Sequence, residues 1–115
     1  MAGISRGDVW LDSLDPIIGS EIGKTRPAIV ISNDINNKYS KTVTLISITS
    51  STSKIYPFEV LLPKGSGKLA KDSKAKCNQV RTVDKRRLVK KTGNLPKSLI
   101  KELENAIIIH LGIPV

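Results

Sequence analysis

Arg26 is well placed to hold a positive charge in a fixed position, because it stands directly before Pro27. A residue before a proline is biased toward an extended backbone, which sets the direction in which its side chain leaves the chain. Arg26 is the last residue but one of the stretch 15–27, which contains two glycines, has a proline near each end and exceeds the length of a hairpin loop. Loops longer than their connection requires are often functional. A cation held by such a loop suits an anionic ligand.

Residues 64–91 carry most of the positive charge. The chain has a formal net charge of +9, and these residues hold eleven Lys and Arg against two Asp, whereas cations and acids cancel elsewhere. Such a basic region indicates a polyanionic partner, either nucleic acid or a membrane surface. The simpler alternative is that the lysines only keep the protein in solution. No apolar run approaches the ~20 residues of a membrane span, and the N-terminus lacks an apolar signal-peptide region.

Several chemistries are excluded because Cys and His are scarce. The chain has one cysteine, Cys77, and one histidine, His110, to which we assign no catalytic role. An internal disulfide, a Cys-rich zinc site and a two-histidine ribonuclease site are therefore excluded, and we expect a cytoplasmic protein without metal or cofactor. The glycine-rich basic segment 63–68 lacks the spacing of a phosphate-binding P-loop, which excludes nucleotide hydrolysis.

Short strands separated by turn residues account for most of the chain. Alternating or β-branched runs predict strands at 9–14, 28–32, 42–49, 58–62 and 73–78, then a short strand or turn at 79–84 and a last short strand at 88–89. Asn and Asp predict a turn at 33–37. Toward the C-terminus the apolar residues take helical spacing, with Pro96 as the first helical residue and Gly112 as the stop.

This order of elements predicts a mainly β fold. At 115 residues the chain can bury a core without disulfides, and we expect one domain over residues 1–115. We predict a small, strongly twisted β-barrel with the C-terminal helix packed on it. Trp10 could stack on a base, but a lone Trp in so small a protein is more often a core residue. At 73–78, Ala75 and Cys77 should point inward, and Lys74 and Lys76 outward.

Several spaced motifs resemble those of the MazF/PemK family of toxins from bacterial toxin–antitoxin pairs. They occur in the family's order and extend over nearly the whole chain. The motifs are Arg6-Gly7-Asp8-Val9-Trp10, Gly19-Ser20-Glu21, Arg26-Pro27, Ile48-Thr49, Tyr56-Pro57-Phe58-Glu59-Val60, Gln79-Val80-Arg81-Thr82-Val83-Asp84 and Leu111-Gly112.

The resemblance implies an SH3-like β-barrel that forms a homodimer. It also implies sequence-specific, ribosome-independent cleavage of single-stranded RNA, chiefly mRNA, which leaves a 2′,3′-cyclic phosphate and a 5′-hydroxyl. An antitoxin protein would block the RNA groove. The alternative is a non-catalytic SH3-like barrel toxin that binds nucleic acid, or a protein target such as DNA gyrase.

Carried over by position, the family's catalytic pair falls on Arg26 and Thr49. Ser20, Glu21 and Gln79 fall on positions that line the RNA groove. Arginine stays protonated at neutral pH, so we expect Arg26 to stabilise the transition state or protonate the leaving group, with Glu21 or a water as the better base. The simpler alternative is a salt bridge from Arg26 to Glu21 that only holds the loop, with Thr49 an ordinary strand-end residue.

Four lysines complete the expected site and its surroundings. Lys54 follows the third predicted strand and Lys68 lies in the basic loop, and both are expected to contact RNA. The family usually carries apolar residues where this chain has Lys74 and Lys76. Those two lysines would either change the dimer or antitoxin surface or extend the basic RNA track.

Overall fold

The computed structural model describes residues 3–13 and 24–115. The predicted loop residues 15–23, which include Ser20 and Glu21, lie outside the described residues, as does Leu14. The described elements, in chain order, are β1 (Asp8–Ser13), β2 (Thr25–Val30), α1 (Asp34–Tyr39), β3 (Thr42–Thr49), β4 (Glu59–Leu62), the 3₁₀ helix η1 (Ser66–Lys68), β5 (Ser73–Asp84), the 3₁₀ helix η2 (Lys85–Arg87), β6 (Leu88–Asn94) and α2 (Lys97–Leu111).

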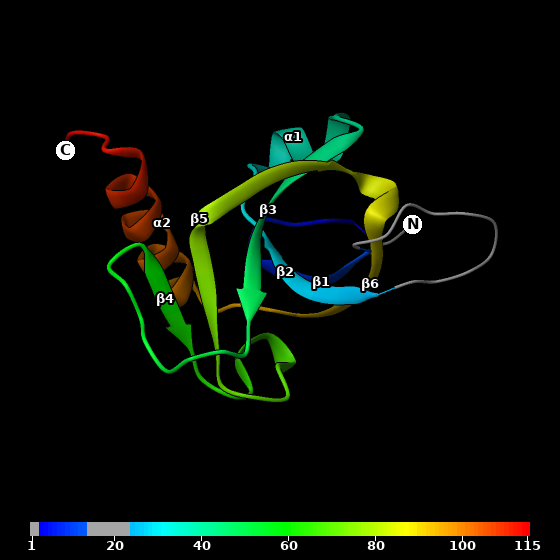
Figure 1. The fold of residues 1–115 in the computed structure, drawn as a ribbon. Coiled ribbons are helices and arrows are strands. Elements are labelled where there is room, and N and C mark those ends of the chain that lie inside the picture. The colour runs from blue at the N-terminus through cyan, green and yellow to red at the C-terminus, as the bar shows by residue number, and fades with distance from the viewer. Residues whose placement is uncertain (1–2, 14–23) are drawn as a thin grey trace.

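The strands form one antiparallel sheet in the order β4-β5-β3-β2-β1-β6. Figure 1 shows how strongly the sheet curves, with the long β5 bending across it. Within the described residues the end strands β4 and β6 do not pair with each other. The predicted mainly β fold with a C-terminal helix is confirmed. The strongly twisted sheet is not closed into a barrel, since among the described residues β4 pairs only with β5 and packs against α2.

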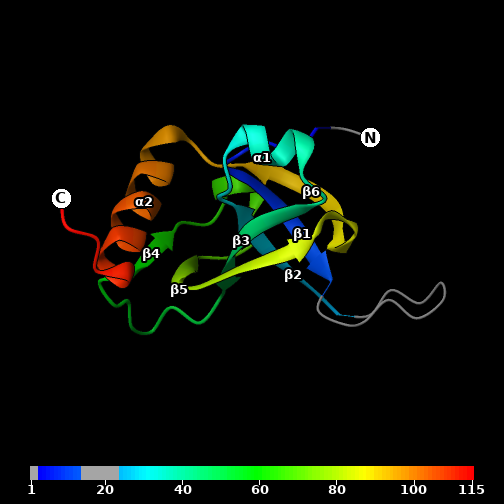
Figure 2. The ribbon, with the colours of Figure 1, turned by 90° about the horizontal axis from the view of Figure 1, so that it is seen from above.

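Two clusters of apolar side chains form the core. One joins α2 to the sheet through Leu103 and Ala106, and Figures 1 and 2 show α2 beside β4 and β5. The other surrounds Trp10, which is buried as predicted. Neighbouring residues of β2 alternate between the clusters, since Ile29 belongs to the first and Val30 to the second. β2 is therefore covered on both faces, as its continuous apolar run predicts.

The segment 33–37, predicted as a turn, begins a short helix, α1. Asn33 caps this helix, since its side-chain oxygen accepts a hydrogen bond of 2.8 Å from the backbone N–H of Asn36. Asp34 in the first turn and Lys38 in the last turn suit the helix dipole. The turn prediction was wrong because the same side-chain-to-backbone bonding that favours Asn in turns also makes it a good N-cap.

Three strands are longer than predicted. β2 begins at Thr25, three residues before the predicted start at 28, so Arg26 lies on a strand and not in the loop. β5 is continuous from Ser73 to Asp84, and so joins the segments predicted separately as 73–78 and 79–84. β6 runs to Asn94 because it pairs with β1 over most of its length, where only 88–89 was predicted. The C-terminal helix agrees with the prediction to within a residue, since Pro96 is its N-cap and Gly112 its C-cap, with a φ of 67°.

The loop before β5 docks on β6 through two glycines. A Cβ atom on Gly93 of β6 would lie 2.7 Å from the backbone carbonyl of Gly67 in η1. The hydroxyl of Thr92 donates to the carbonyl of Val9 at 3.1 Å and lies 3.4 Å from the carbonyl of Gly67. The two backbones are therefore packed with no room for a side chain at Gly93.

Gly93→Ala should lower the free energy of unfolding by about 1–3 kcal/mol, because η1 must shift to admit the methyl group. Urea unfolding measures this. Gly3→Ala is the control, since a Cβ there would have nothing within 4 Å. Equal stability of the two variants would show that η1 does not pack tightly on β6 in solution.

Candidate active site

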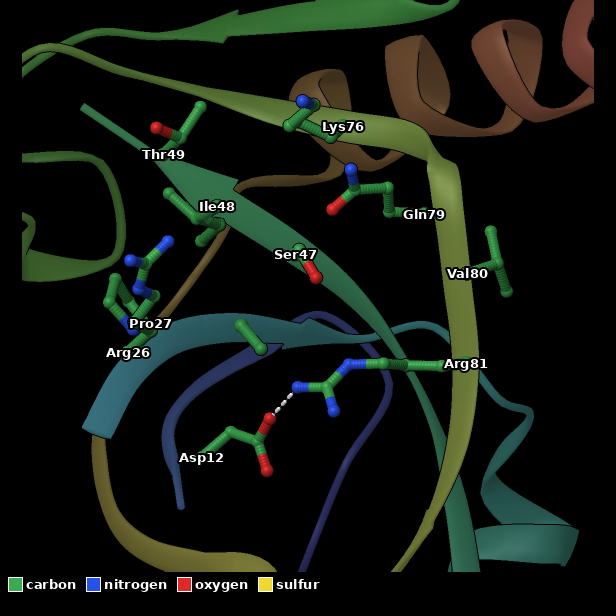
Figure 3. A pocket seen from close by; sticks show the side chains of 11 residues that line it. Asp12, Arg26, Pro27, Ser47, Ile48, Thr49, Lys76, Gln79, Val80 and Arg81 are labelled. Carbon is green, nitrogen blue, oxygen red and sulfur yellow. Dashed lines mark hydrogen bonds and ion pairs between the residues drawn. The ribbon is translucent and has the colours of Figure 1, made fainter. Parts of the chain in front are cut away.

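One pocket lies where β1, β2, β3 and β5 come together (Figure 3). Its volume is about 510 Å³. Among the described residues, three cations, Arg26, Lys76 and Arg81, line it against one acid, Asp12, and this charge suits an anionic ligand. The remaining lining residues are Pro27, Ala28, Ser47, Ile48, Thr49, Gln79 and Val80.

Arg26 enters this pocket from β2. Its backbone has the extended form expected before Pro27, and it stands opposite Asp12 of β1 in the strand register. The residue is exposed, and Figure 3 shows its guanidinium pointing into the pocket. The backbone of a paired strand is more rigid than a loop tip. Arg26 is therefore held in a fixed position relative to the ligand group that it contacts.

Thr49 is the last residue of β3, the strand that pairs with β2. Its hydroxyl oxygen accepts a hydrogen bond from the backbone N–H of Ser51 at 3.3 Å. A hydroxyl accepts through its lone pairs, so this bond does not use the O–H proton. The structure therefore brings Arg26 and Thr49, predicted as a pair, to one pocket, where both side chains can donate hydrogen bonds to the same ligand.

A shift in register between β3 and β5 shapes the opposite wall. Ile46 pairs with Val80, but the next residue, Ser47, pairs with Lys76, so residues 77–79 of β5 have no partner on β3. Such bulges bend a strand and re-aim its side chains. Here the bulge brings Gln79, predicted as a groove residue, to the pocket together with Lys76.

A half-buried ion pair crosses the pocket between β1 and β5. Asp12 is fully buried, and its Oδ2 accepts a hydrogen bond from Nη2 of Arg81 (Figure 3). Its other oxygen, Oδ1, has no hydrogen-bond partner among the described residues. Burial raises the pKa of Asp12 above its ordinary value, although the charge and hydrogen bond of Arg81, and the charge of Arg87, act to lower it.

A second buried pair holds the segment that follows Thr49. Lys74 Nζ lies 3.0 Å from Glu59 Oε1 and donates to the carbonyl of Lys54 at 2.7 Å, while the backbone N–H of Tyr56 donates to Glu59 at 2.9 Å. The prediction that Lys74 points outward was wrong. A lysine on a half-buried strand turns inward when a buried carboxylate on the neighbouring strand can pair with it. Lys74 therefore does not extend a basic RNA track.

The other predicted RNA contacts lie elsewhere. Lys54 and Lys68 are exposed and do not line the pocket, and the Lys54 ammonium lies 4.8 Å from the centre of the Tyr56 ring. Ser20 and Glu21 are outside the described residues. Of the predicted site residues, the structure thus brings together Arg26, Thr49 and Gln79.

Sequence reasoning missed Asp12, Ser47 and Arg81 as pocket residues. Arg81 had a usable signal, because it lies two residues after Gln79 on a strand and so shares its face. Asp12 had no such signal, because acids are common near strand ends and only the neighbouring strands show that this one lines a pocket.

Cys77 and His110 contribute nothing to the pocket. Cys77 is fully buried, and burial together with the charge of Glu59 raises the pKa of its thiol to about 12, so it is not a nucleophile. His110 lies near the end of α2, with its ring centre 6.3 Å from that of Phe58. In residues 3–13 and 24–115, no group of three or more His, Cys, Asp or Glu could hold a metal ion. No helix in that part of the chain is long and apolar enough to cross a membrane.

Comparison with known proteins places this pocket in a familiar fold. Residues 5–111 match the family described as "PemK-like, MazF-like toxin of type II toxin-antitoxin system". The chain is 45% identical, over 96% of its length and 92% of the relative's, to "Endoribonuclease MazF" of Staphylococcus epidermidis. It is similar to a MazF crystal structure from Deinococcus radiodurans (28% identity, TM-score 0.77, 98% and 100% of the two chains). A MazE–MazF crystal structure from that organism also matches (26% identity, TM-score 0.74, 98% and 100%).

Glu59→Gln should lower the free energy of unfolding by about 3 kcal/mol, because it leaves the buried Lys74 ammonium without its counter-charge. Burial acts to raise the pKa of Glu59, but hydrogen bonds from Tyr56 and Lys74 and the nearby lysine charges outweigh burial and lower it below 4.5. A lowered pKa in the folded state contributes stability at neutral pH that is lost as pH falls below this value. The decrease in the free energy of unfolding between neutral and acidic pH, measured by urea unfolding at several pH values, should be smaller in Glu59→Gln than in the wild type.

Glu102→Gln, a change at an exposed position of α2, is the matched control. If both variants were equally stable at neutral pH, the Glu59–Lys74 pair would not hold the segment after Thr49.

Proposed function

Because the chain belongs to the family of PemK-like, MazF-like toxins of type II toxin–antitoxin systems, we propose that it is the endoribonuclease of such a system and cuts single-stranded mRNA at specific sequences. The observation that carries this proposal is that Arg26 and Thr49 line one positively charged pocket. The 45% identical endoribonuclease of S. epidermidis supports it. Cleavage would stop translation by destroying messages, without the ribosome's help.

In the proposed reaction, Arg26 and Thr49 act on the phosphate that is cut. The RNA 2′-hydroxyl loses its proton to a base, its oxygen attacks phosphorus, and the bond to the 5′ oxygen breaks as that oxygen takes up a proton. The products are a 2′,3′-cyclic phosphate and a 5′-hydroxyl. Arg26 donates charge-assisted hydrogen bonds, and Thr49 a neutral one, to the phosphate oxygens as negative charge grows on them.

Proton transfer falls to other groups in this proposal. Glu21 or a water takes the 2′ proton, and Arg26 or a water protonates the 5′ oxygen. None of these is a histidine tuned to neutral pH, so the rate relies on holding the 2′ oxygen, phosphorus and 5′ oxygen in line. A strand-borne Arg26 and a strand-end Thr49 provide that kind of fixed geometry.

Family membership also supports two protein partners, which we include in the proposal. An antitoxin would cover the pocket, and the MazE–MazF crystal structure from D. radiodurans supports this. A second copy of the chain would cover exposed apolar side chains of β4 and α2, namely Leu61, Ile109 and Leu111. Residues 1–115 would act as one domain, in the cytoplasm where mRNA is available.

Arg26→Ala and Thr49→Ala should each slow RNA cleavage by about 100- to 1000-fold, the usual cost of removing one donor to a transition-state oxygen. The assay uses a mixed RNA pool and maps the cut ends, which also identifies the cleavage sequence. EDTA should leave wild-type cleavage unchanged, because no step of the proposal needs a metal ion.

Lys101→Ala, which removes an exposed cation from α2, is the matched control and should cut at the wild-type rate. Full activity of Arg26→Ala would place catalysis elsewhere. Wild-type protein that binds RNA without cutting it would favour the non-catalytic binding toxin.

Lys68→Ala should weaken RNA binding to a similar extent for all sequences, because an exposed lysine contacts phosphate and not base edges. The plot of log binding constant against log salt should become shallower by about 0.7, the value for one phosphate contact to a single strand. Binding is measured in an Arg26→Ala background, in which cleavage is expected to be too slow to interfere. A changed cleavage sequence in Lys68→Ala would contradict this assignment.

A further inference from the structure

The ion pair of Asp12 and Arg81 has no part in the proposed cleavage step, yet it lies in the same pocket (Figure 3). The two partners differ sharply in accessibility. The side chain of Asp12 is 1% exposed, whereas that of Arg81 is 39% exposed. The carboxylate is therefore hidden behind the guanidinium, and only Arg81 can meet a ligand directly.

Asp12 fixes the direction of the Arg81 side chain. Figure 3 shows Arg81 reaching from β5 across the pocket to Asp12 on β1. A guanidinium carries five N–H donors in a rigid plane, and the bond from Nη2 to Asp12 leaves most of them for other acceptors. Because the plane is rigid, one charge-assisted bond at its edge orients the remaining donors as well.

The same pairing weakens Arg81 as a simple anion attractor. Asp12 and Arg81 together carry no net charge, so much of the long-range pull of Arg81 on phosphate is cancelled. The Arg81 guanidinium thus keeps a fixed direction for its hydrogen bonds, while its charge is largely cancelled by that of Asp12. That combination suits recognition of a base edge, where hydrogen-bond geometry discriminates, more than recognition of a phosphate, where charge dominates.

The neighbours of Arg81 also suit a base. Gln79 precedes it by two residues on β5, and Ser47 faces the pocket from β3; both are uncharged side chains that donate and accept hydrogen bonds. Figure 3 shows Gln79 and Arg81 on the β5 side, with Arg26 and Thr49 on the side of β2 and the end of β3. On one side of the pocket, Arg26 and Thr49 can therefore meet a phosphate, and beside it Gln79 and Arg81 of β5 offer hydrogen bonds of fixed direction.

We propose that Arg81 reads one base of the RNA next to the cut, by donating to a carbonyl oxygen on the base edge, and that Asp12 is its positioning residue. This inference rests on the proposed function and names the sequence-reading part of that site. Single-stranded RNA is read through such exposed base edges. Adenine has no carbonyl oxygen, so the position that Arg81 reads should disfavour adenine.

The test compares cleavage preferences of the wild type and Arg81→Lys on an RNA pool randomised around the cut. Lysine keeps a charge beside Asp12 but loses the planar fork of donors. Discrimination between a carbonyl-bearing base and adenine should fall at least about fivefold at one position, as expected for loss of one specific base contact. Preferences at the other positions should stay as in the wild type, and the pool should still be cut.

Asp12→Asn tests the positioning role, because its side chain does not touch RNA. It should relax preference at the same position as Arg81→Lys, and adding it to Arg81→Lys should cause no further loss. If Arg81→Lys does not fold, Asp12→Leu/Arg81→Leu replaces both partners by apolar side chains, so that no buried charge is left unpaired, and carries the test. Relaxation at a different position, or an additive loss in the double variant, would overturn the positioning role.

Two results would overturn base reading by Arg81. One is unchanged preference at every position; the other is a uniform loss of binding with a shallower salt dependence, which marks a phosphate contact. The same preferences can be measured as oligonucleotide binding in an Arg26→Ala background. Base reading can therefore be tested even if the wild type does not cut RNA. That result would contradict the proposed cleavage but not base reading by Arg81.

Discussion

The register shift between β3 and β5 is the constraint on which the candidate site depends. β3 lies near the middle of the sheet and pairs with β2 on one side and β5 on the other, so a change in its pairing shifts the strands on both sides relative to each other. The shift falls between Ile46 and Ser47, where the first of these residues is a fully buried core side chain and the second faces the pocket. The pairing of β3 with β5 is thus regular up to the buried Ile46 and is interrupted at Ser47, where the pocket begins. The extra residues of β5 then supply Gln79 and, beyond it, Arg81 to the wall of the pocket.

Buried carboxylates organise the cations around this pocket. Asp12 holds Arg81 on one side, and Glu59 holds Lys74 and, through Tyr56, the segment after Thr49. In each pair the acid is more deeply buried than its partner. Burying an acid costs desolvation free energy, and the paired cation, together with nearby charges and hydrogen-bond donors, offsets part of that cost. The basic tract that suggests an RNA-binding surface is therefore not uniform: Lys74 is paired with Glu59 inside the fold, Arg81 is paired with Asp12 at the pocket, and Lys68 is exposed in the loop.

Much of the fold could be predicted from the sequence, and the reasons are visible in particular elements. β3 was predicted over its full length because its alternation is regular, and α2 because Pro96 and Gly112 mark its ends. Arg26, Thr49 and Gln79 were predicted through a family resemblance carried by motifs. What could not be predicted depends on pairing between distant residues. Asp12 and Arg81 are 69 positions apart, and nothing near either residue announces the other. The inward turn of Lys74 likewise depends on Glu59, which lies on a different strand.

The central claim is that Arg26 and Thr49 act on a phosphate while the neighbouring 2′-hydroxyl attacks it. Two RNAs of the same sequence, which differ only by hydrogen in place of that hydroxyl at the cut position, test this claim most directly. Binding and single-turnover cleavage would be measured for both. We expect both RNAs to bind with similar affinity, because the hydroxyl takes part in the chemistry, and only the unmodified one to be cut. Cleavage of the deoxy-substituted RNA at the same bond would contradict this account.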